Sequence, residues 1–448
     1  MESLIAELER VPTFRTFGRV AGIQGLMVEV SGLFGNVSIG SRCNINGRGG
    51  NVIPGEVVGF RHNNALLMPF SSLDGVGLGA KAIVAEQEAV AHPHTTWCGR
   101  VLNGLGEPID GGPPLPQGPL AYPLRTKAPP ASMRKRLGPK LDLGIRSINT
   151  FTTVCRGQRM GIFAGSGIGK SVLLSMMARY ATSDVNVIGL VGERGREVKE
   201  FIEDYLGPEG MKRSIVVVAT SDESALMRRQ AAYLTLTIAE YFRDQGKSVL
   251  CMIDSVTRFA MSQREIGLSG GEPPASKGYT PTVFAELPRL LERAGTGTGE
   301  GTITGLFTVL VEGDDHNEPV ADAVRGILDG HIVLDRSIAE KGRYPPINIL
   351  RSVSRSMPDC NTKEEQELVA RARTLIATYE DMADMIRLGA YRAGTDPSVD
   401  EAIRLHDGLE KFLGQDKNER AQLAPGYAAL SKLITTGAPK PAPVKAKA

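Results

Sequence analysis

Hydrophobic and polar positions divide the chain into three stretches with different periods. In residues 17–90, brief apolar runs separated by glycine turns predict the strands of a small closed β-barrel. The central stretch alternates short apolar strands with helix-length segments, which is typical of a parallel sheet covered by helices on both faces. The predicted barrel strands are 17–23, 26–30, 52–60, 65–68 and 80–85, and the predicted central strands are 160–164, 185–191, 215–219, 249–253 and 303–311.

Beyond Lys363 the strand pattern stops. Residues 367–386 carry apolar side chains at helical spacing, Asp396-Pro397 has the composition of a helix start, and a third helical stretch spans 419–434. Residues 437–448 are rich in proline and lysine, and we interpret them as a flexible tail.

The distribution of proline marks the junction between the first two domains. Nine of the 27 prolines lie between Pro108 and Pro139, which excludes a central strand or a long helix there. We therefore expect a short helix plus barrel over 1–97, a parallel-sheet domain over 98–365 that starts with an irregular crossing segment over 98–150, a helical domain over 366–436, and the tail.

Charge and cysteine content disfavour several classes of protein. The 448 residues carry a formal charge of +2, and residues 1–97 hold seven Lys and Arg against eight Asp and Glu, so we expect no nucleic-acid partner. Five cysteines without a CxxC pair disfavour a disulfide framework and a zinc ribbon. The acidic N-terminus and the lack of any 18-residue apolar run predict a soluble, cytoplasmic chain.

The segment from Met160 to Leu174 has the pattern of a phosphate-binding loop: an apolar strand, a glycine-rich turn and a helix. Triphosphate binding needs backbone N–H groups around the phosphates, a lysine and a hydroxyl on Mg²⁺, and Lys170 and Ser171 fit the last two roles. Ala164 replaces the opening glycine of the motif, and a glycine turn that binds nothing is the alternative. The expected loop residues are Gly165, Ser166, Gly167, Ile168, Gly169, Lys170 and Ser171.

Two acidic residues follow other predicted strands. Asp254 ends the apolar strand 249–253, where a carboxylate is able to hold Mg²⁺ through its water shell. Glu193 follows the strand 185–191 and is a candidate for polarising the water that attacks a γ-phosphate. Taken singly, each has an ordinary alternative, which is a solvated strand end for Asp254 and a charged loop for Glu193.

These three elements, with Gly278-Tyr-Thr-Pro281 and Ser352-Val-Ser-Arg-Ser-Met357, resemble the catalytic family of rotary ATP synthases and its relatives that energise protein export. The resemblance covers nearly the whole chain, and residues 156–180 and 254–266 are most similar to flagellar type III export ATPases. It implies an α/β fold with an N-terminal β-barrel, a central RecA-like phosphate-loop domain and C-terminal helices. It also implies an enzyme that hydrolyses ATP with Mg²⁺.

The resemblance gives a role to each candidate residue of the loop and the strand ends. Lys170 would bind the phosphates, Ser171 and Asp254 would hold Mg²⁺, and Glu193 would orient the attacking water. The arginines that it implies near these residues are Arg194 and Arg258.

Two further residues are implied by the same resemblance. Arg355 matches an arginine that family members project into the nucleotide site of the neighbouring subunit, and Tyr344 matches a position whose ring packs on adenine. Their alternatives are an ordinary ion pair for Arg355 and simple packing for Tyr344.

The partners implied by the resemblance are a homohexameric ring, a stator-like regulator at the N-terminal segment, chaperone–substrate complexes and an export gate at the cytoplasmic membrane. The catalytic subunit of a rotary ATP synthase is an alternative, but it would need a second type of subunit in its ring. A ring-shaped nucleic-acid translocase is disfavoured by the neutral barrel. A structural nucleotide-binding subunit has no need of Glu193.

Overall fold

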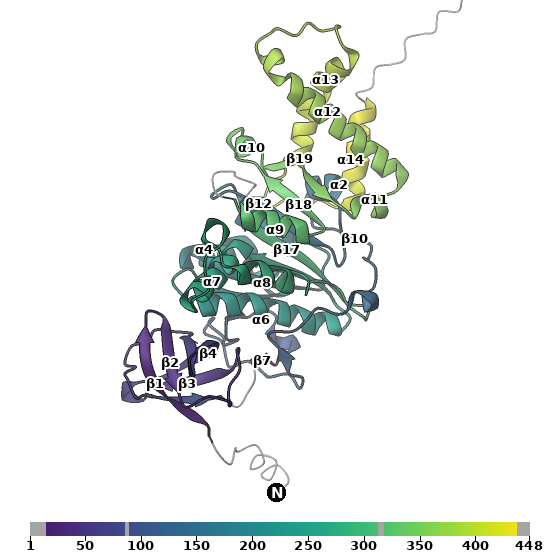
Figure 1. Ribbon diagram of the computed structural model, residues 1–448. Helices are drawn as coiled ribbons and strands as arrows, with labels where there is room; N and C mark the ends of the chain where they lie inside the picture. Colours follow the sequence, from purple (N-terminus) through teal and green to yellow (C-terminus); the bar gives the residue numbers. More distant parts are fainter. Residues whose placement is uncertain (1–14, 86–88, 312–317, 437–448) are drawn as a thin grey trace, which may run out of the picture.

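The computed structural model describes residues 15–85, 89–311 and 318–436, which form three consecutive parts (Figure 1). A barrel lies at one end, an α/β part in the middle and a group of helices at the other end. The short helix expected within 1–14 and the tail expected at 437–448 lie outside the described residues. Among the described helices, none combines the length and apolar character needed to cross a bilayer.

Six antiparallel strands close the N-terminal barrel in the order β1-β2-β5-β4-β3-β6, which confirms the predicted closed barrel. Their inward side chains form a separate core that includes Val28, Ile45 and Leu67. Strand β3 was not predicted, because its sequence Arg-Cys-Asn-Ile-Asn has only two apolar residues. The strands are β1 Phe17–Gln24, β2 Met27–Ser31, β3 Arg42–Asn46, β4 Val52–Arg61, β5 Asn64–Pro69 and β6 Lys81–Val84.

A nine-stranded sheet forms the middle of the protein in the order β19-β18-β12-β17-β15-β13-β14-β8, with β16 paired to β17. The pairs from β18 to β8 are parallel, as predicted, whereas β19 and β16 run antiparallel to their neighbours and make the sheet mixed. The strands are β8 Val101–Asn103, β12 Arg159–Ala164, β13 Val185–Glu193, β14 Ser214–Thr220, β15 Ser248–Asp254, β16 Gly295–Thr296, β17 Thr302–Leu310, β18 Gly330–Leu334 and β19 Ile347–Ser354.

Helices cover both faces of this sheet because successive strand residues point to opposite sides. Val187 and Ile253 pack in one core with α6 to α9, while Ile188 and Met252 pack in another with α2, α3 and α4. The helices of the first face are α6 Ala225–Asp244, α7 Val256–Ser269, α8 Pro281–Leu291 and α9 Pro319–Ile327; those of the second are α2 Arg146–Phe151, α3 Lys170–Tyr180, α4 Gly195–Glu200, the π-helix η4 Phe201–Leu206 and α5 Gly207–Met211.

The predicted crossing segment contains only short elements. Its strands and turns, together with the other short elements of the chain, are η1 Arg48–Gly50, β7 Val90–Ala91, η2 Thr95–Trp97, β9 Tyr122–Pro123, η3 Ala131–Met133, β10 Lys140–Leu141, β11 Val154–Cys155, η5 Ser276–Gly278, α10 Arg336–Glu340 and α11 Met357–Cys360.

Three helices form the C-terminal part, which shares the second core with the sheet domain. They are α12 Lys363–Arg387, α13 Pro397–Leu413 and α14 Leu423–Thr436. Asp396 caps α13, as its sequence predicted, by accepting a hydrogen bond from the backbone of Ser398. Helix α14 starts four residues later than expected, because Gln415 and its neighbours form a loop in which Gln415 Nε2 donates to the carbonyl of Gly144 at 2.8 Å.

Buried charges join the barrel to the sheet domain. Glu56 of β4 is 2% exposed and accepts a hydrogen bond from Arg229 of α6 at 2.7 Å. Arg125 of the crossing segment reaches the same carboxylate at 3.0 Å. Burial lowers the pKa of Arg229, although Glu56 opposes the shift. The contact between these two parts therefore combines the packing of barrel side chains such as Met27 and Leu66 with a carboxylate whose removal would leave the buried Arg229 unpaired.

Candidate nucleotide site

The loop 165–169 leaves the end of β12 and leads directly into α3. Gly167 (φ 77°) and Gly169 (φ 88°) take left-handed backbone conformations, so this tight turn requires glycine at both places. No side chain caps the start of α3, which leaves the first N–H groups of the helix free to bind an anion. Ile168 buries its side chain in the core below and offers only its backbone to the loop.

Three ionisable residues from different elements meet below this loop. The ammonium of Lys170 lies 3.1 Å from Oε1 of Glu193 and forms a second ion pair with Asp254. Asp254, at the end of β15, is 2% exposed and also accepts a hydrogen bond from the Thr308 hydroxyl at 2.7 Å. Parallel strands end at the same edge of a sheet, which is why residues so distant in sequence come together here.

The pKa shifts of two of these groups reflect burial and mutual attraction. Burial alone would lower the pKa of Lys170, but the carboxylates of Asp254 and Glu193 outweigh it and hold that pKa above its ordinary value. Burial raises the pKa of Asp254, and the attraction of Lys170 offsets only part of the effect. The lysine is thus held as a cation, and Asp254 is a carboxylate that would gain from a further positive charge.

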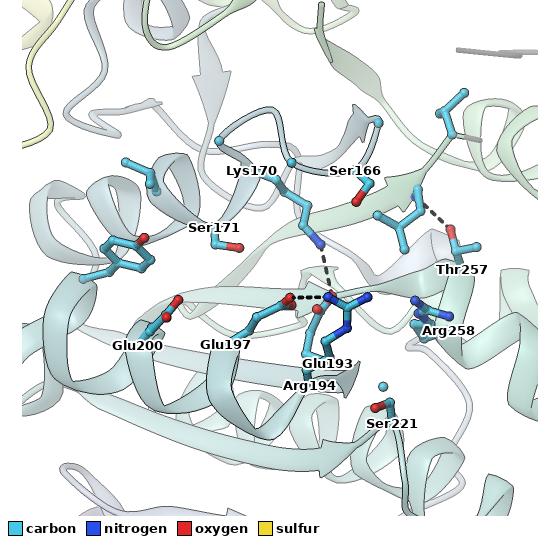
Figure 2. Close-up of a pocket in the computed structure, with 18 of the residues that line it drawn as sticks. Ser166, Lys170, Ser171, Glu193, Arg194, Glu197, Glu200, Ser221, Thr257 and Arg258 are labelled. Atoms are coloured by element: carbon cyan, nitrogen blue, oxygen red, sulfur yellow. Dashed lines mark hydrogen bonds and ion pairs between the residues drawn. The ribbon is translucent and has the colours of Figure 1, made fainter. Parts of the chain in front are cut away.

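Lys170 and Glu193 line a cavity of ≈ 830 Å³ (Figure 2). The loop and Lys170 form one wall, and Glu193, Arg194 and helix α4 face them across the space. The other residues that line it are Gly165, Ser166, Gly167, Gly169, Ser171, Val172, Gly192, Glu197, Glu200, Tyr205, Ser221, Thr257, Arg258, Met261, Leu310, Val311 and Arg336.

Both arginines that the sequence placed near the site line this cavity. Arg258 of α7 packs against Gly192, where a Cβ would lie 2.8 Å from the arginine, so the absence of a side chain permits this approach. The buried Nε of Arg258 has no hydrogen-bond partner, which leaves part of its donor capacity for an anionic ligand. Arg194 is more exposed and pairs with Glu197 at 3.4 Å.

Tyr344 lies beside Gly169 of the loop. It lines a smaller cavity of ≈ 250 Å³, and Gly169 and Val172 line both cavities. A Cβ on Gly169 would lie 3.8 Å from the Tyr344 ring, so the ring packs against the backbone of the loop. The remaining lining residues are Leu173, Met176, Pro345, Pro346, Gln415, Asp416 and Lys417.

Arg355 lies elsewhere. It directly follows β19, and its backbone N–H donates to the carbonyl of Asp329 at 2.9 Å, at the start of β18. The phosphate-binding loop leaves the opposite end of β12, the parallel neighbour of β18. The side chain of Arg355 is exposed and forms no ion pair with the residues that the structure describes. The structure therefore does not bring Arg355 to the loop of its own chain.

Several residues of the cavity were missed by the sequence analysis. Thr257 holds the end of β17 by accepting a hydrogen bond from the backbone of Leu310 at 2.9 Å. Arg336 donates to the carbonyl of Ser166 in the loop at 3.0 Å. The position of Arg336, two residues after β18 ends at Leu334, was a signal that could have placed it near the loop. Residues that follow parallel strands gather at the same edge of a sheet.

A phosphate-binding loop at the end of a parallel strand, with two carboxylates on neighbouring strand ends, defines this protein as a nucleotide-binding ATPase of the phosphate-loop class. Comparison with known families narrows the class. The ATP synthase alpha/beta family, nucleotide-binding domain, matches residues 144–354, and the T3SS EscN ATPase C-terminal domain matches residues 361–432.

Similar proteins of known name and structure cover nearly the whole chain. It is 58% identical to the flagellum-specific ATP synthase of Caulobacter vibrioides, over 97% of this chain and 99% of that protein. It is 45% identical to the one of Salmonella typhimurium, over 97% of each. The assembled ATPase EscN of the enteropathogenic E. coli type III secretion system superimposes with a TM-score of 0.88 at 38% identity, covering 93% of this chain and 100% of that one. The chain belongs to the ATP synthase alpha/beta family and, within it, to the flagellar and type III export ATPases.

Proposed function

We propose that this export ATPase hydrolyses Mg²⁺·ATP as a homohexamer in which Arg355 of one copy completes the nucleotide site of the next, and that turnover energises export of flagellar proteins. One observation carries the proposal. Lys170, Glu193 and Asp254 meet at one edge of the sheet, whereas Arg355 lies at the other and forms no ion pair within the described part of the chain. A single chain therefore has the groups that bind the phosphates and orient the attacking water. Its own Arg355 lies at the opposite end of the strands.

Within one chain, the phosphates bind to the N–H groups of the loop and to Lys170. The carboxylates beside Lys170 keep it charged, since they hold its pKa above the ordinary value. Glu193 lines the same cavity and accepts a hydrogen bond from the water that attacks the γ-phosphorus. The bond between that phosphorus and its bridging oxygen breaks, and ADP and phosphate leave.

The oxygen donors at the strand ends fit Mg²⁺. Ser171 lines the cavity at the first turn of α3, and Asp254 lies below it with one oxygen held by Thr308. Hydroxyl and carboxylate oxygens are ligands that Mg²⁺ prefers, directly or through water. When bound, the ion neutralises charge on the phosphates. The buried Asp254 carboxylate, whose pKa is raised by burial, gains the additional cation that its surroundings lack.

The smaller cavity suits the adenine. Tyr344 offers an aromatic face there, next to the loop that holds the phosphates, and the opposite wall is formed by apolar side chains of α3 such as Leu173 and Met176. A flat heterocycle between a ring and apolar side chains is bound by stacking and burial.

Assembly in a ring supplies the remaining cation. An arginine that enters the site of a neighbouring copy stabilises charge in the transition state, an effect of about 10³ to 10⁵ in rate. Head-to-tail contacts between identical chains close into rings, and each copy then both donates and receives an Arg355. The relative EscN is described as an assembled ATPase and in complex with its central stalk EscO, which supports a ring and a stalk-like partner here.

Membership of the export ATPase family leads us to propose further partners for this chain. We expect a stator-like regulator at the N-terminal segment, chaperone–substrate complexes, and an export gate at the inner face of the cytoplasmic membrane where the ring is bound peripherally. The nearly balanced charge of residues 1–97 argues against a nucleic-acid partner.

The ATPase rate per chain, measured against protein concentration, tests turnover and assembly together. We expect the rate to rise as rings form and to level off when assembly is complete, in step with the ring fraction seen by light scattering. Lys170→Ala, carried through the same dilution series, gives the background. A rate per chain that stays constant on dilution to monomers would remove the requirement for a neighbouring arginine.

A further inference from the structure

The segment 335–346, which contains α10, touches the phosphate-binding loop at two points. Near its start, Nη2 of Arg336 donates to the carbonyl oxygen of Ser166 at 3.0 Å. Near its end, the ring of Tyr344 packs against Gly169. The two contacts fall on different residues of the loop, and Arg336 lines the larger cavity while Tyr344 lines the smaller one. The segment therefore forms a bracket around the loop.

The contact with Ser166 affects the direction in which the backbone N–H of Gly167 points. In a trans peptide the C=O and N–H groups point in opposite directions, so fixing the carbonyl of Ser166 also fixes the N–H of Gly167. Gly167 has a wide choice of backbone conformations because it lacks a Cβ, and its added Cβ would meet no other atom within 4 Å. The space at a Gly167 Cβ is open, so no packing there restrains the peptide, and the hydrogen bond from Arg336 supplies a restraint from outside the loop.

The bracket itself is held firmly at both ends. Asp335 caps α10 by accepting hydrogen bonds from the backbone and hydroxyl of Ser337 at 2.9 and 2.8 Å, and its other oxygen accepts one from Asn348 at 3.0 Å. The backbone N–H of Asp335 donates to Pro346 at 2.9 Å, and Arg343 pairs with Glu410 of α13 at 2.9 Å. The backbone of Arg336 thus starts from a fixed place.

We propose that Arg336 is a positioning residue for the phosphate-binding loop: its guanidinium holds the Ser166–Gly167 peptide so that the Gly167 N–H points at the nucleotide phosphates. The inference rests on the proposed function, since it takes the ligand of the loop to be a phosphate chain. Backbone donors that are oriented before the ligand arrives cost no reorganisation when it binds. Through Arg336 the bracket orients a peptide of the phosphate-binding loop. Through Tyr344 it supplies the ring on which the adenine stacks.

The test compares ligands that have phosphates with one that has none. Binding of ATP, inorganic tripolyphosphate and adenosine is measured by titration calorimetry for the wild type, Arg336→Ala and Arg336→Lys. The matched control is Arg387→Ala, which removes an exposed arginine that forms a single 3.0 Å contact with Asp384 on α12, away from both cavities. We expect Arg336→Ala to weaken ATP and tripolyphosphate about tenfold, the effect of a lost hydrogen bond from a charged donor.

The affinity for adenosine should stay the same in every variant, and Arg387→Ala should bind all three ligands like the wild type. Arg336→Lys should recover part of the affinity for ATP and tripolyphosphate that Arg336→Ala loses. Unchanged tripolyphosphate binding by Arg336→Ala would overturn the role of Arg336. An equal loss for adenosine would also overturn it, because the residue would then support the whole site. If the proposed function itself were wrong, the wild type would bind neither ATP nor tripolyphosphate, or Lys170→Ala would bind both normally, which is a different result.

Discussion

The two edges of the central sheet hold their cations in different ways. At the edge where the parallel strands end, Lys170 is bound by two carboxylates of its own chain and faces a cavity. At the edge where β12 and β18 begin, Arg159 is held by Asp329 at 3.1 Å, but Arg355 is exposed and has no carboxylate partner among the described residues.

This difference separates charges that serve the chain from one that is available to another molecule. Arg159 is satisfied within the fold, and its neighbours would be left unpaired if it were removed. Among the described residues Arg355 is held through its backbone N–H, which leaves its guanidinium available to a second copy. A site built at one edge and a cation displayed at the other are what a head-to-tail ring requires.

The largest effect on turnover is expected at the edge where the parallel strands end. Lys170→Ala should abolish ATP hydrolysis, because it removes the cation that meets the phosphates and leaves Asp254 buried without its ion pair. The rate of phosphate release measures it, and Lys199→Ala, an exposed lysine on the neighbouring α4, is the control. Turnover close to that of the wild type would contradict the assignment of the loop.

The next effect tests the opposite edge. Arg355→Ala should lower turnover by about 10³ to 10⁵ while each chain still binds ATP, whereas Arg351→Ala, which removes an exposed arginine of the preceding strand β19, should have little effect. Mixing Arg355→Ala chains with Glu193→Gln chains should restore some activity, since certain interfaces then pair an intact carboxylate with an intact arginine. Inactive rings that are shown to be mixed would mean that Arg355 does not act between copies.

Glu193→Gln should lower turnover by about 10² to 10⁴ and leave ATP binding in place, because the amide keeps the shape and loses the negative charge. Single-turnover rates and nucleotide titrations separate the two quantities. Glu203→Gln, whose carboxylate pairs only weakly with Lys199 at 3.9 Å, is the matched control. A parallel loss of affinity and rate would identify Glu193 as a binding or folding residue.

The smallest effect concerns the base. Tyr344→Ala should raise the KM for ATP by about tenfold, since a stacked ring contributes about 0.5 to 1.5 kcal/mol beyond its burial. Tyr344→Phe keeps the ring and should behave like the wild type, and kcat should change little in either variant. A fall in kcat without a change in KM would place Tyr344 outside base recognition.

The sequence predicted the elements whose pattern is strong. An apolar strand followed by glycines predicted the loop before α3. An apolar strand that ends in Asp254 predicted an acid near that loop, because parallel strands end at one edge of the sheet. Strand β3 was missed because it is short and half polar, and β19 because its second half buries Ser352 and Ser354 and exposes Val353, which reverses the expected apolar pattern.

Residues whose place depends on tertiary contacts were out of reach of pattern alone. Arg336 lies in an exposed turn of α10, and only the path of the chain brings it to Ser166. The role expected of Arg355 came from family resemblance, and its distance from the loop of its own chain depends on β19 running antiparallel to β18, which no local pattern indicated.

The barrel has an apolar interior of its own, but its Met27, Leu66 and Met68 also pack into one core of the sheet domain, and the C-terminal helices share the other core of that domain. Cooperativity follows shared cores, so the chain contains fewer independent folding units than it has visible parts. We therefore expect the helical part to melt together with the nucleotide domain. The barrel is tied to that domain by the packing of Met27 and Leu66 as well as by Glu56, so we expect its opening to expose part of the core of the sheet domain.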